Sequence, residues 1–134
     1  MANPPLISVV DDDNSVRESI QSLVRSVGFA VKVFASAEEF WSWDHLQDTD
    51  CLILDVRMPG MSGIELQRRL IANHPEIPII FITAHSSEEE VRSLALRNGA
   101  AAYLAKPLSE EALLNAVHLA LNKENNGLSK TGMK

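Results

Sequence analysis

The sequence predicts an α/β domain in which helices cover both faces of a parallel β-sheet. Five short apolar segments alternate with five segments of helical periodicity, and the connections between them are short. Strict alternation of this kind is typical of parallel strands joined by right-handed crossovers, which place helices on the two faces of the sheet. In such folds ligands bind at the carboxyl ends of the strands, so functional residues are expected at that edge.

Five segments have the length and the content of branched apolar residues that are typical of strands. They are residues 6–10 (LISVV), 30–34 (AVKVF), 51–55 (CLILD), 77–83 (IPIIFIT) and 101–105 (AAYLA). Four of them are continuously apolar, which indicates burial on both faces of the sheet. Residues 30–34 alternate, and we therefore expect this strand nearer an edge.

Serines at the start of each helical pattern indicate where the helices begin. The expected starts are Ser15, Ser36, Ser62 or Gly63, Ser86 or Ser87, and Ser109. Ser15 and Ser36 each have a glutamate three residues later, which is the spacing of a capping box. Gly28 and Gly99 are expected to end the first and fourth helices.

Composition predicts one soluble domain. The 134 residues are 46% hydrophobic, which is enough for a sizeable core. The net charge of −6 argues against direct binding of nucleic acid or an anionic membrane by this segment. A single cysteine, Cys51, and the lack of a leader or long apolar segment predict a cytoplasmic location. Residues 1–122 are expected to form the domain, and residues 123–134 a tail or the start of a linker.

Polar residues follow four of the five predicted strands. They are Asp11 and Asp12 after the first strand, Asp55 at the end of the third, Thr83 at the end of the fourth and Lys106 after the fifth. Each has an ordinary explanation by itself, such as an acidic helix entry, a turn or a strand end. Because the carboxyl ends of parallel strands share one edge, we instead expect these side chains to meet in one site.

This set of residues predicts metal-assisted phosphoryl chemistry. Clustered carboxylates raise one another's pKa unless a cation neutralises them, and oxygen ligands with open positions favour Mg²⁺. A carboxylate also attacks phosphoryl groups to form an aspartyl phosphate. We interpret Asp11 and Asp12 as metal-binding residues, and Asp55 as the nucleophile that also contributes an oxygen to the metal.

Three further groups are expected to hold the phosphate. Lys106 supplies a positive charge to a phosphate oxygen. Thr83 offers a hydroxyl donor, and the backbone amide of Ala84, close to the start of a helix, is expected to assist.

These residues lie in segments that resemble the receiver domain of bacterial two-component response regulators. The segments are VVDDD (9–13), LILDVRMPGMSGIEL (52–66), FITAH (81–85) and AYLAKPL (102–108). The likeness covers about residues 5–122 and implies a flavodoxin-like (βα)5 three-layer sandwich with strand order 2-1-3-4-5. Within the family the chain looks most similar to the FixJ-type subgroup, whose members usually carry a C-terminal helix-turn-helix output domain.

The resemblance implies a role for each matched residue. It makes Asp55 the acceptor of a phosphoryl group from a sensor histidine kinase, and it adds the backbone carbonyl of Arg57 to the Mg²⁺ ligands. Thr83 and Tyr103 match the switch pair that changes the surface of the fourth helix, fifth strand and fifth helix. Such a domain is not an enzyme with a separate substrate, because it catalyses only its own phosphorylation and dephosphorylation.

The resemblance also sets expectations about partners and alternatives. It implies an output domain in the full-length protein and a homodimer on phosphorylation. A stand-alone relay protein and a phosphorylation-independent interaction domain remain alternatives. A flavin carrier is disfavoured because the acidic loop at residues 11–13 would repel the flavin phosphate, and a dehalogenase-type phosphatase because Arg57 stands where a second acid is needed. Arg57 and His85 occupy positions that tune phosphoryl lifetime in the family.

Overall fold

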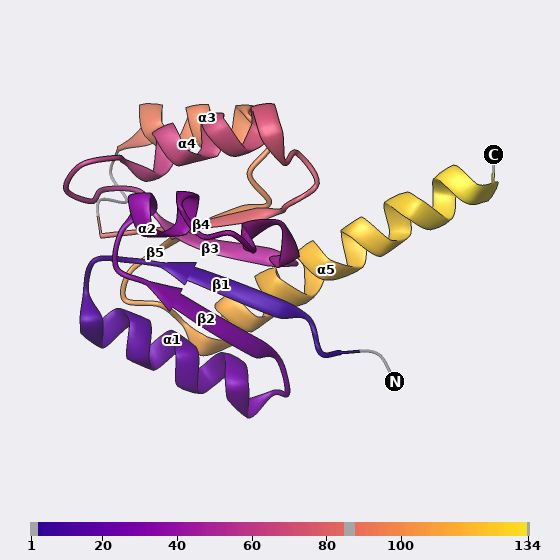
Figure 1. Cartoon of the computed structure of the whole chain (residues 1–134), viewed down its shortest axis with the longest axis horizontal. Helices are drawn as coiled ribbons and strands as arrows, with labels where there is room; N and C mark the ends of the chain where they lie inside the picture. Colours follow the sequence, from indigo (N-terminus) through magenta and orange to yellow (C-terminus); the bar gives the residue numbers. More distant parts are fainter. Residues whose placement is uncertain (1–2, 85–87, 134) are drawn as a thin grey trace.

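A five-stranded parallel sheet with the order β2-β1-β3-β4-β5 forms the centre of the molecule (Figure 1). The computed structural model describes residues 3–84 and 88–133, with side chains up to residue 122. The strands are β1 (Leu6–Val10), β2 (Ala30–Phe34), β3 (Cys51–Asp55), β4 (Ile79–Thr83) and β5 (Ala102–Ala105). The predicted fold class and strand order are therefore confirmed, with β2 at an edge.

The fourth strand starts later than the sequence predicts. We expected it to begin at Ile77, but β4 begins at Ile79. Pro78 has no backbone N–H to donate to a neighbouring strand, so it stands at the entrance of the strand, where its carbonyl accepts a hydrogen bond from the Leu52 amide at 2.9 Å.

Helices cover both faces of the sheet, with α2, α3 and α4 on one face and α1 and α5 on the other (Figure 1). The helices are α1 (Asn14–Ser26), α2 (Ala37–Trp41), α3 (Gly63–Asn73), α4 (Glu89–Arg97) and α5 (Glu110–Met133), with a short 3-10 turn at Leu46–Asp48. Within the described residues, no helix is both long and apolar enough to span a membrane. The predicted domain end near residue 122 stays a prediction.

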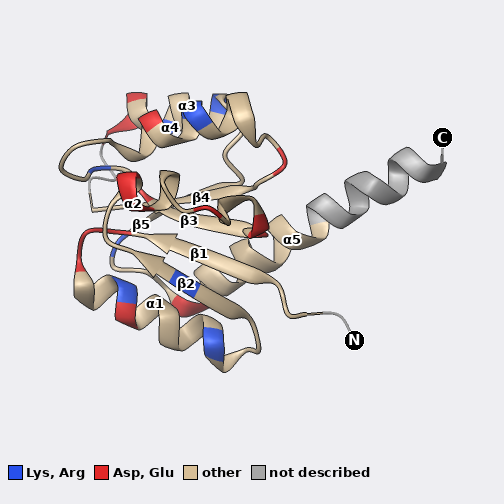
Figure 2. Ribbon diagram, viewed as in Figure 1, with Lys and Arg blue, Asp and Glu red and all other residues tan. Residues whose placement is uncertain are grey.

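Alternate residues of the central strands supply two separate cores. Val10, Leu54 and Phe81 face α2, α3 and α4, and they are fully buried. Val9, Ile53 and Ile82 face α1 and α5 and are equally buried. This two-sided burial explains why β1, β3 and β4 are continuously apolar. The same prediction was wrong for β5, which lies at the other edge of the sheet and is only partly buried. Figure 2 shows the consequence for charge, which lies mainly on the helices and the loops.

Three of the predicted helix starts are confirmed by side-chain caps. The hydroxyls of Ser36, Ser62 and Ser109 accept hydrogen bonds from backbone amides in the first turns of α2, α3 and α5, at 3.1, 3.1 and 3.2 Å. Such caps satisfy amides that have no partner inside the helix. Ser86 and Ser87, the predicted start of α4, lie outside the described residues.

The predicted start of the first helix at Ser15 is wrong. Asp13 has the extended backbone of an N-cap, and its Oδ1 accepts hydrogen bonds from the amides of Ser15 at 2.8 Å and Val16 at 3.4 Å. An aspartate is as good an N-cap as a serine, and Asp13 comes first along the chain. Asp13 therefore caps α1, and only Asp11 and Asp12 of this acidic run belong to the cluster described below.

The start of α3 packs directly on the end of β3. The Gly63 amide donates a hydrogen bond to the Val56 carbonyl at 2.9 Å. A Cβ atom at Gly63 would lie 2.2 Å from the carbonyl oxygen of Asp55, which is a backbone atom and cannot rotate away. Glycine is required here because the two backbones approach so closely.

We expect Gly63→Ala to lower the free energy of unfolding by about 3 kcal/mol, because α3 must move away from β3. Gly99→Ala is the matched control. Gly99 has a positive φ of 99° but no atom within 4 Å of an added Cβ, so its loss should be about 1 kcal/mol. Urea unfolding followed by circular dichroism measures both. Equal losses in the two variants would show that the close approach does not constrain the fold.

Candidate functional site

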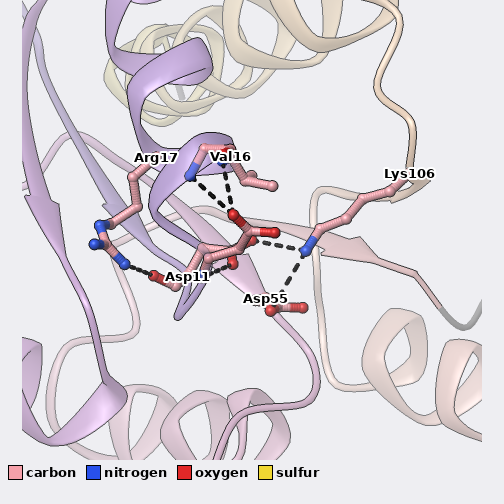
Figure 3. A network of polar contacts seen from close by, with 7 residues as sticks. Asp11, Val16, Arg17, Asp55 and Lys106 are labelled. Carbon is pink, nitrogen blue, oxygen red and sulfur yellow. Dashed lines mark hydrogen bonds and ion pairs between the residues drawn. The ribbon is translucent and has the colours of Figure 1, made fainter.

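The predicted site residues converge at the carboxyl edge of the sheet. Asp11 and Asp12 follow β1, Asp55 and Thr83 are the last residues of β3 and β4, and Lys106 follows β5. Figure 3 shows Asp11, Asp55 and Lys106 pointing toward one another from three different segments. The parallel register thus brings together side chains that are up to 95 positions apart in the sequence.

Lys106 forms ion pairs with two carboxylates. Its Nζ lies 2.8 Å from Asp11 Oδ2 and 3.5 Å from Asp55 Oδ2. The backbone supports this position, since the Lys106 amide donates a hydrogen bond to the Thr83 carbonyl at 2.8 Å. The end of β5 is thereby fixed to the end of β4, next to the acids.

Three carboxylates lie close enough to share a cation. One oxygen from each of Asp11, Asp12 and Asp55 can be chosen so that all three lie within 4.8 Å of one another. Asp11 is fully buried and its Oδ1 accepts a hydrogen bond from the Asp13 amide at 2.8 Å. Asp12 is exposed, so the cluster opens to solvent on that side. An all-oxygen set with an open side fits Mg²⁺, which keeps several of its waters.

Without a metal, Asp55 carries an electrostatic penalty. Burial raises its pKa, and the neighbouring charge of Asp11 and, less strongly, Asp12 raises it further. The ion pair with Lys106 lowers it, but the net result is a pKa of about 7. The Asp55 side chain is only 7% exposed, so solvent screens these charges weakly.

The pKa of Lys106 is also raised, but for a lysine this shift favours the charged form. Burial lowers the pKa of Lys106, but the hydrogen bond and the charge of Asp11, together with the charge of Asp55, outweigh burial and raise it. Lys106 therefore stays protonated, and one ammonium group faces three carboxylates. The cluster is short of positive charge, and a bound divalent cation would supply it.

Thr83 and Tyr103 occupy neighbouring strands on the inner side of the site. Thr83 is fully buried, and the hydroxyl oxygen of Tyr103 is also inaccessible to solvent. Burial raises the pKa of Tyr103, and the nearby Thr83 hydroxyl partly offsets this effect. The tyrosine ring packs 6.1 Å from the ring of Phe81, measured between centroids. The two predicted switch residues are thus close enough to affect each other.

Arg57, two residues after Asp55, has an exposed side chain that pairs with Glu88, the residue that precedes α4. Its Nε donates to Glu88 Oε1 at 2.7 Å, and its Nη2 pairs with Oε2. Ala84 directly follows β4 and is exposed. The predicted roles of the Arg57 carbonyl and the Ala84 amide stay predictions, and His85 lies outside the described residues.

Sequence reasoning missed three contacts around this site. Arg17 of α1 donates a hydrogen bond to the Asp11 carbonyl at 2.7 Å, as Figure 3 shows. Glu88 pairs with Arg57, and Glu38 of α2 accepts a hydrogen bond from the Met61 amide at 2.8 Å. A Pro-Gly pair at positions 59 and 60 was the only local signal, because it marks a tight turn near the third contact.

An acidic cluster with a lysine at the carboxyl edge of a sheet in this order defines the class of receiver domains of two-component signalling. The family model of the response regulator receiver domain matches residues 7–118. The chain belongs to this family.

Several relatives support the same membership. The response regulator protein TmoT of Ectopseudomonas mendocina is 47% identical over 116 residues, which are 87% of this chain and 52% of that protein. The transcriptional regulatory protein FixJ of Azorhizobium caulinodans is 38% identical over 117 residues, which are 87% of this chain and 55% of FixJ. A solved structure of the response regulator StyR has a TM-score of 0.83 at 44% identity, over 97% of this chain and 65% of that one. The chain spans about half the length of TmoT and FixJ.

In metal-free buffer, we expect Asp55→Asn to stabilise the protein increasingly as the pH rises from 4 to 8. The pKa of Asp55 is raised from 3.8 to about 7, so the folded state binds more protons than the unfolded state between these values. The contribution of Asp55 to the free energy of unfolding therefore falls with rising pH, by up to about 4 kcal/mol, and asparagine removes this loss.

Urea unfolding at pH 4, 6 and 8 with a chelator measures the effect. The exposed Asp44 provides a control, because Asp44→Asn should follow the wild type at each pH. A constant difference between Asp55→Asn and the wild type across this range would contradict the raised pKa.

Proposed function

We propose that Asp55 accepts a phosphoryl group from a sensor histidine kinase, and that this event changes the surface formed by α4, β5 and α5. The observation that carries the proposal is the position of the Lys106 ammonium, 2.8 Å from Asp11 Oδ2 and 3.5 Å from Asp55 Oδ2. A partly buried lysine that pairs with two buried acids is well placed to contact a phosphoryl oxygen next to the nucleophile.

Asp11, Asp12 and Asp55, together with the Arg57 carbonyl, are the residues that would hold Mg²⁺. When bound, Mg²⁺ neutralises carboxylate and phosphoryl oxygens in the site. A positive charge there also favours the ionised form of Asp55, which is the form able to attack. The exposed position of Asp12 leaves the cluster open to solvent on one side.

In the proposed phosphoryl transfer, Asp55 is the nucleophile and three other residues bind the phosphoryl oxygens. A carboxylate oxygen of Asp55 attacks phosphorus, the bond from phosphorus to the imidazole nitrogen of the kinase breaks, and the imidazole leaves. Lys106 neutralises one phosphoryl oxygen, while the Thr83 hydroxyl and the Ala84 amide donate hydrogen bonds to others. In autodephosphorylation, water attacks phosphorus, the bond from phosphorus to the Asp55 carboxylate oxygen breaks, and inorganic phosphate leaves. The domain would therefore catalyse only reactions of its own phosphoryl group.

Thr83 and Tyr103 connect the site to the proposed switch surface. Both hydroxyls are buried, and they lie near each other on adjacent strands. A shift of Thr83 toward a new phosphate changes what surrounds the Tyr103 hydroxyl. Tyr103 belongs to β5, so its rearrangement would reach the α4–β5–α5 surface.

The length of the relatives supports a C-terminal output domain in the full-length protein. FixJ of Azorhizobium caulinodans and TdiR of Thauera aromatica are transcriptional regulatory proteins, and this chain covers 55% and 54% of their lengths. We therefore favour a helix-turn-helix output domain, homodimerisation on phosphorylation, and a cytoplasmic location, over a stand-alone relay protein. The complete set of acids and lysine disfavours a phosphorylation-independent interaction domain.

Acetyl phosphate or phosphoramidate with Mg²⁺ should add one phosphoryl mass to the wild-type protein. The transfer needs the Asp55 carboxylate as the nucleophile, so Asp55→Asn should gain nothing. Intact mass spectrometry measures both. A phosphoryl mass that persists in Asp55→Asn, or that never forms in the wild type, refutes the assignment.

Replacing Asp12 by asparagine should weaken Mg²⁺ binding at least about tenfold, because a hard cation prefers charged oxygen ligands. Asp13→Asn is the matched control, since it removes the adjacent charge while asparagine still caps α1. Its Mg²⁺ affinity should stay within about threefold of the wild type. Titration calorimetry measures both affinities, and similar values for the two variants would exclude Asp12 from the metal site.

A further inference from the structure

The loop of residues 56–62 connects the end of β3 to α3 and carries Arg57, whose carbonyl is a proposed metal ligand. Both ends of the loop are fixed by backbone hydrogen bonds. The Val56 amide donates to the Ile82 carbonyl at 3.1 Å, and the Gly63 amide donates to the Val56 carbonyl at 2.9 Å. The middle of the loop contains the turn at Pro59 and Gly60, and neither of these bonds reaches it.

Glu38 of α2 contacts the middle of this loop. Its Oε2 accepts a hydrogen bond from the Met61 amide at 2.8 Å. A Cβ atom at Gly60 would lie only 2.4 Å from the same oxygen, so the carboxylate fits against the backbone only because residue 60 is glycine. Gly60 also has a positive φ of 78°, which favours glycine for a second reason.

The helix that carries Glu38 is firmly held. Ala37 and Phe40, on either side of Glu38 in α2, are fully buried in the core. The Ser36 hydroxyl caps the helix by accepting a hydrogen bond from the Glu39 amide. The hydrogen bond from Met61 is the main cause that lowers the pKa of Glu38, and the charge of Arg69 on α3 adds to it. The carboxylate is therefore a charged acceptor at neutral pH.

We propose that Glu38 is a positioning residue for the phosphoacceptor site. By holding the Met61 amide, Glu38 fixes the middle of the 56–62 loop, and with it the direction in which the Arg57 carbonyl points. This inference rests on the proposed function, because it assigns Glu38 a part in the Mg²⁺ affinity of that site. Small displacements matter in such sites, since a shift of about 1 Å can cost about a hundredfold in rate.

The loss of the acceptor should weaken Mg²⁺ binding. We expect Glu38→Ala to raise the Kd for Mg²⁺ about tenfold and to slow phosphorylation by acetyl phosphate by a similar factor, because a hydrogen bond to a charged group is lost. Glu38→Gln keeps an acceptor oxygen without the charge, and it should stay within about threefold of the wild type. Titration calorimetry with Mg²⁺ alone and intact mass spectrometry give the two values.

Glu39→Ala is the matched control on the same helix. Glu39 is also exposed, and its Oε1 accepts a hydrogen bond from the Ala35 amide rather than from the loop. Its removal therefore weakens α2 locally but leaves the Met61 contact in place. We expect Mg²⁺ affinity and phosphorylation rate close to the wild type, measured at a temperature where thermal unfolding shows all variants to be folded.

Hydrogen exchange gives a readout of the contact that does not depend on phosphorylation. The Met61 amide should exchange faster in Glu38→Ala than in the wild type, and at the wild-type rate in Glu39→Ala. Faster exchange combined with unchanged Mg²⁺ affinity would overturn the positioning role, because the contact would then be structural only.

The remaining outcomes separate the two proposals. If the wild type binds Mg²⁺ and becomes phosphorylated, but Glu38→Ala behaves as Glu39→Ala, the role of Glu38 is refuted. If Glu38→Gln behaves as Glu38→Ala, the charge and not the hydrogen bond matters, and the positioning mechanism is wrong. If the wild type neither binds Mg²⁺ nor gains a phosphoryl mass, the proposed function fails first and the role of Glu38 fails with it.

Discussion

The shortage of positive charge at the carboxyl edge of the sheet is the constraint on which the rest of the site depends. Among the residues that the structure describes, the ammonium group of Lys106 is the one that pairs with the cluster of Asp11, Asp12 and Asp55. Two of these acids are buried, so water does not relieve their repulsion. The fold tolerates this arrangement because the flanking strands are buried on both faces and cannot move apart easily. The same imbalance that costs stability in the absence of metal makes the cluster receptive to a divalent cation.

Two carboxylates outside the cluster hold the loop that follows Asp55. Glu38 reaches it from α2 through the Met61 amide, and Glu88 reaches it from the start of α4 through the Arg57 side chain. The Gly63 amide fixes the far end of the loop by donating a hydrogen bond to the Val56 carbonyl. A loop with three anchors on three different elements has few conformations available, and a site that includes a backbone carbonyl from that loop benefits from this restriction.

The sequence was sufficient for the fold and for the residues at the strand ends, but not for these anchors. Five apolar runs and their polar ends are local patterns, and parallel topology places such ends on one edge. Glu38 and Met61 are 23 positions apart, and nothing in either segment marks them as partners. The error at Ser15 has a similar cause, because Asp13 and Ser15 are both good caps and only the backbone geometry distinguishes them. Hydrophobic periodicity in the sequence cannot predict contacts that depend on how two surface elements approach each other.

The ion pair between Arg57 and Glu88 connects the loop after Asp55 to the start of α4. The charge of Glu88 raises the pKa of Tyr103 in β5, and the charges of Arg57 and Arg92 lower it. On the proposed function, a phosphoryl group on Asp55 would add negative charge two residues before Arg57, whose side chain pairs with Glu88. Weakening of the Arg57–Glu88 pair would loosen α4 at the same time as Thr83 moves on the other side of Tyr103. The weaker ion pair and the shift of Thr83 would then both change the surroundings of Tyr103. This gives a physical reason for a coordinated change at the α4–β5–α5 surface.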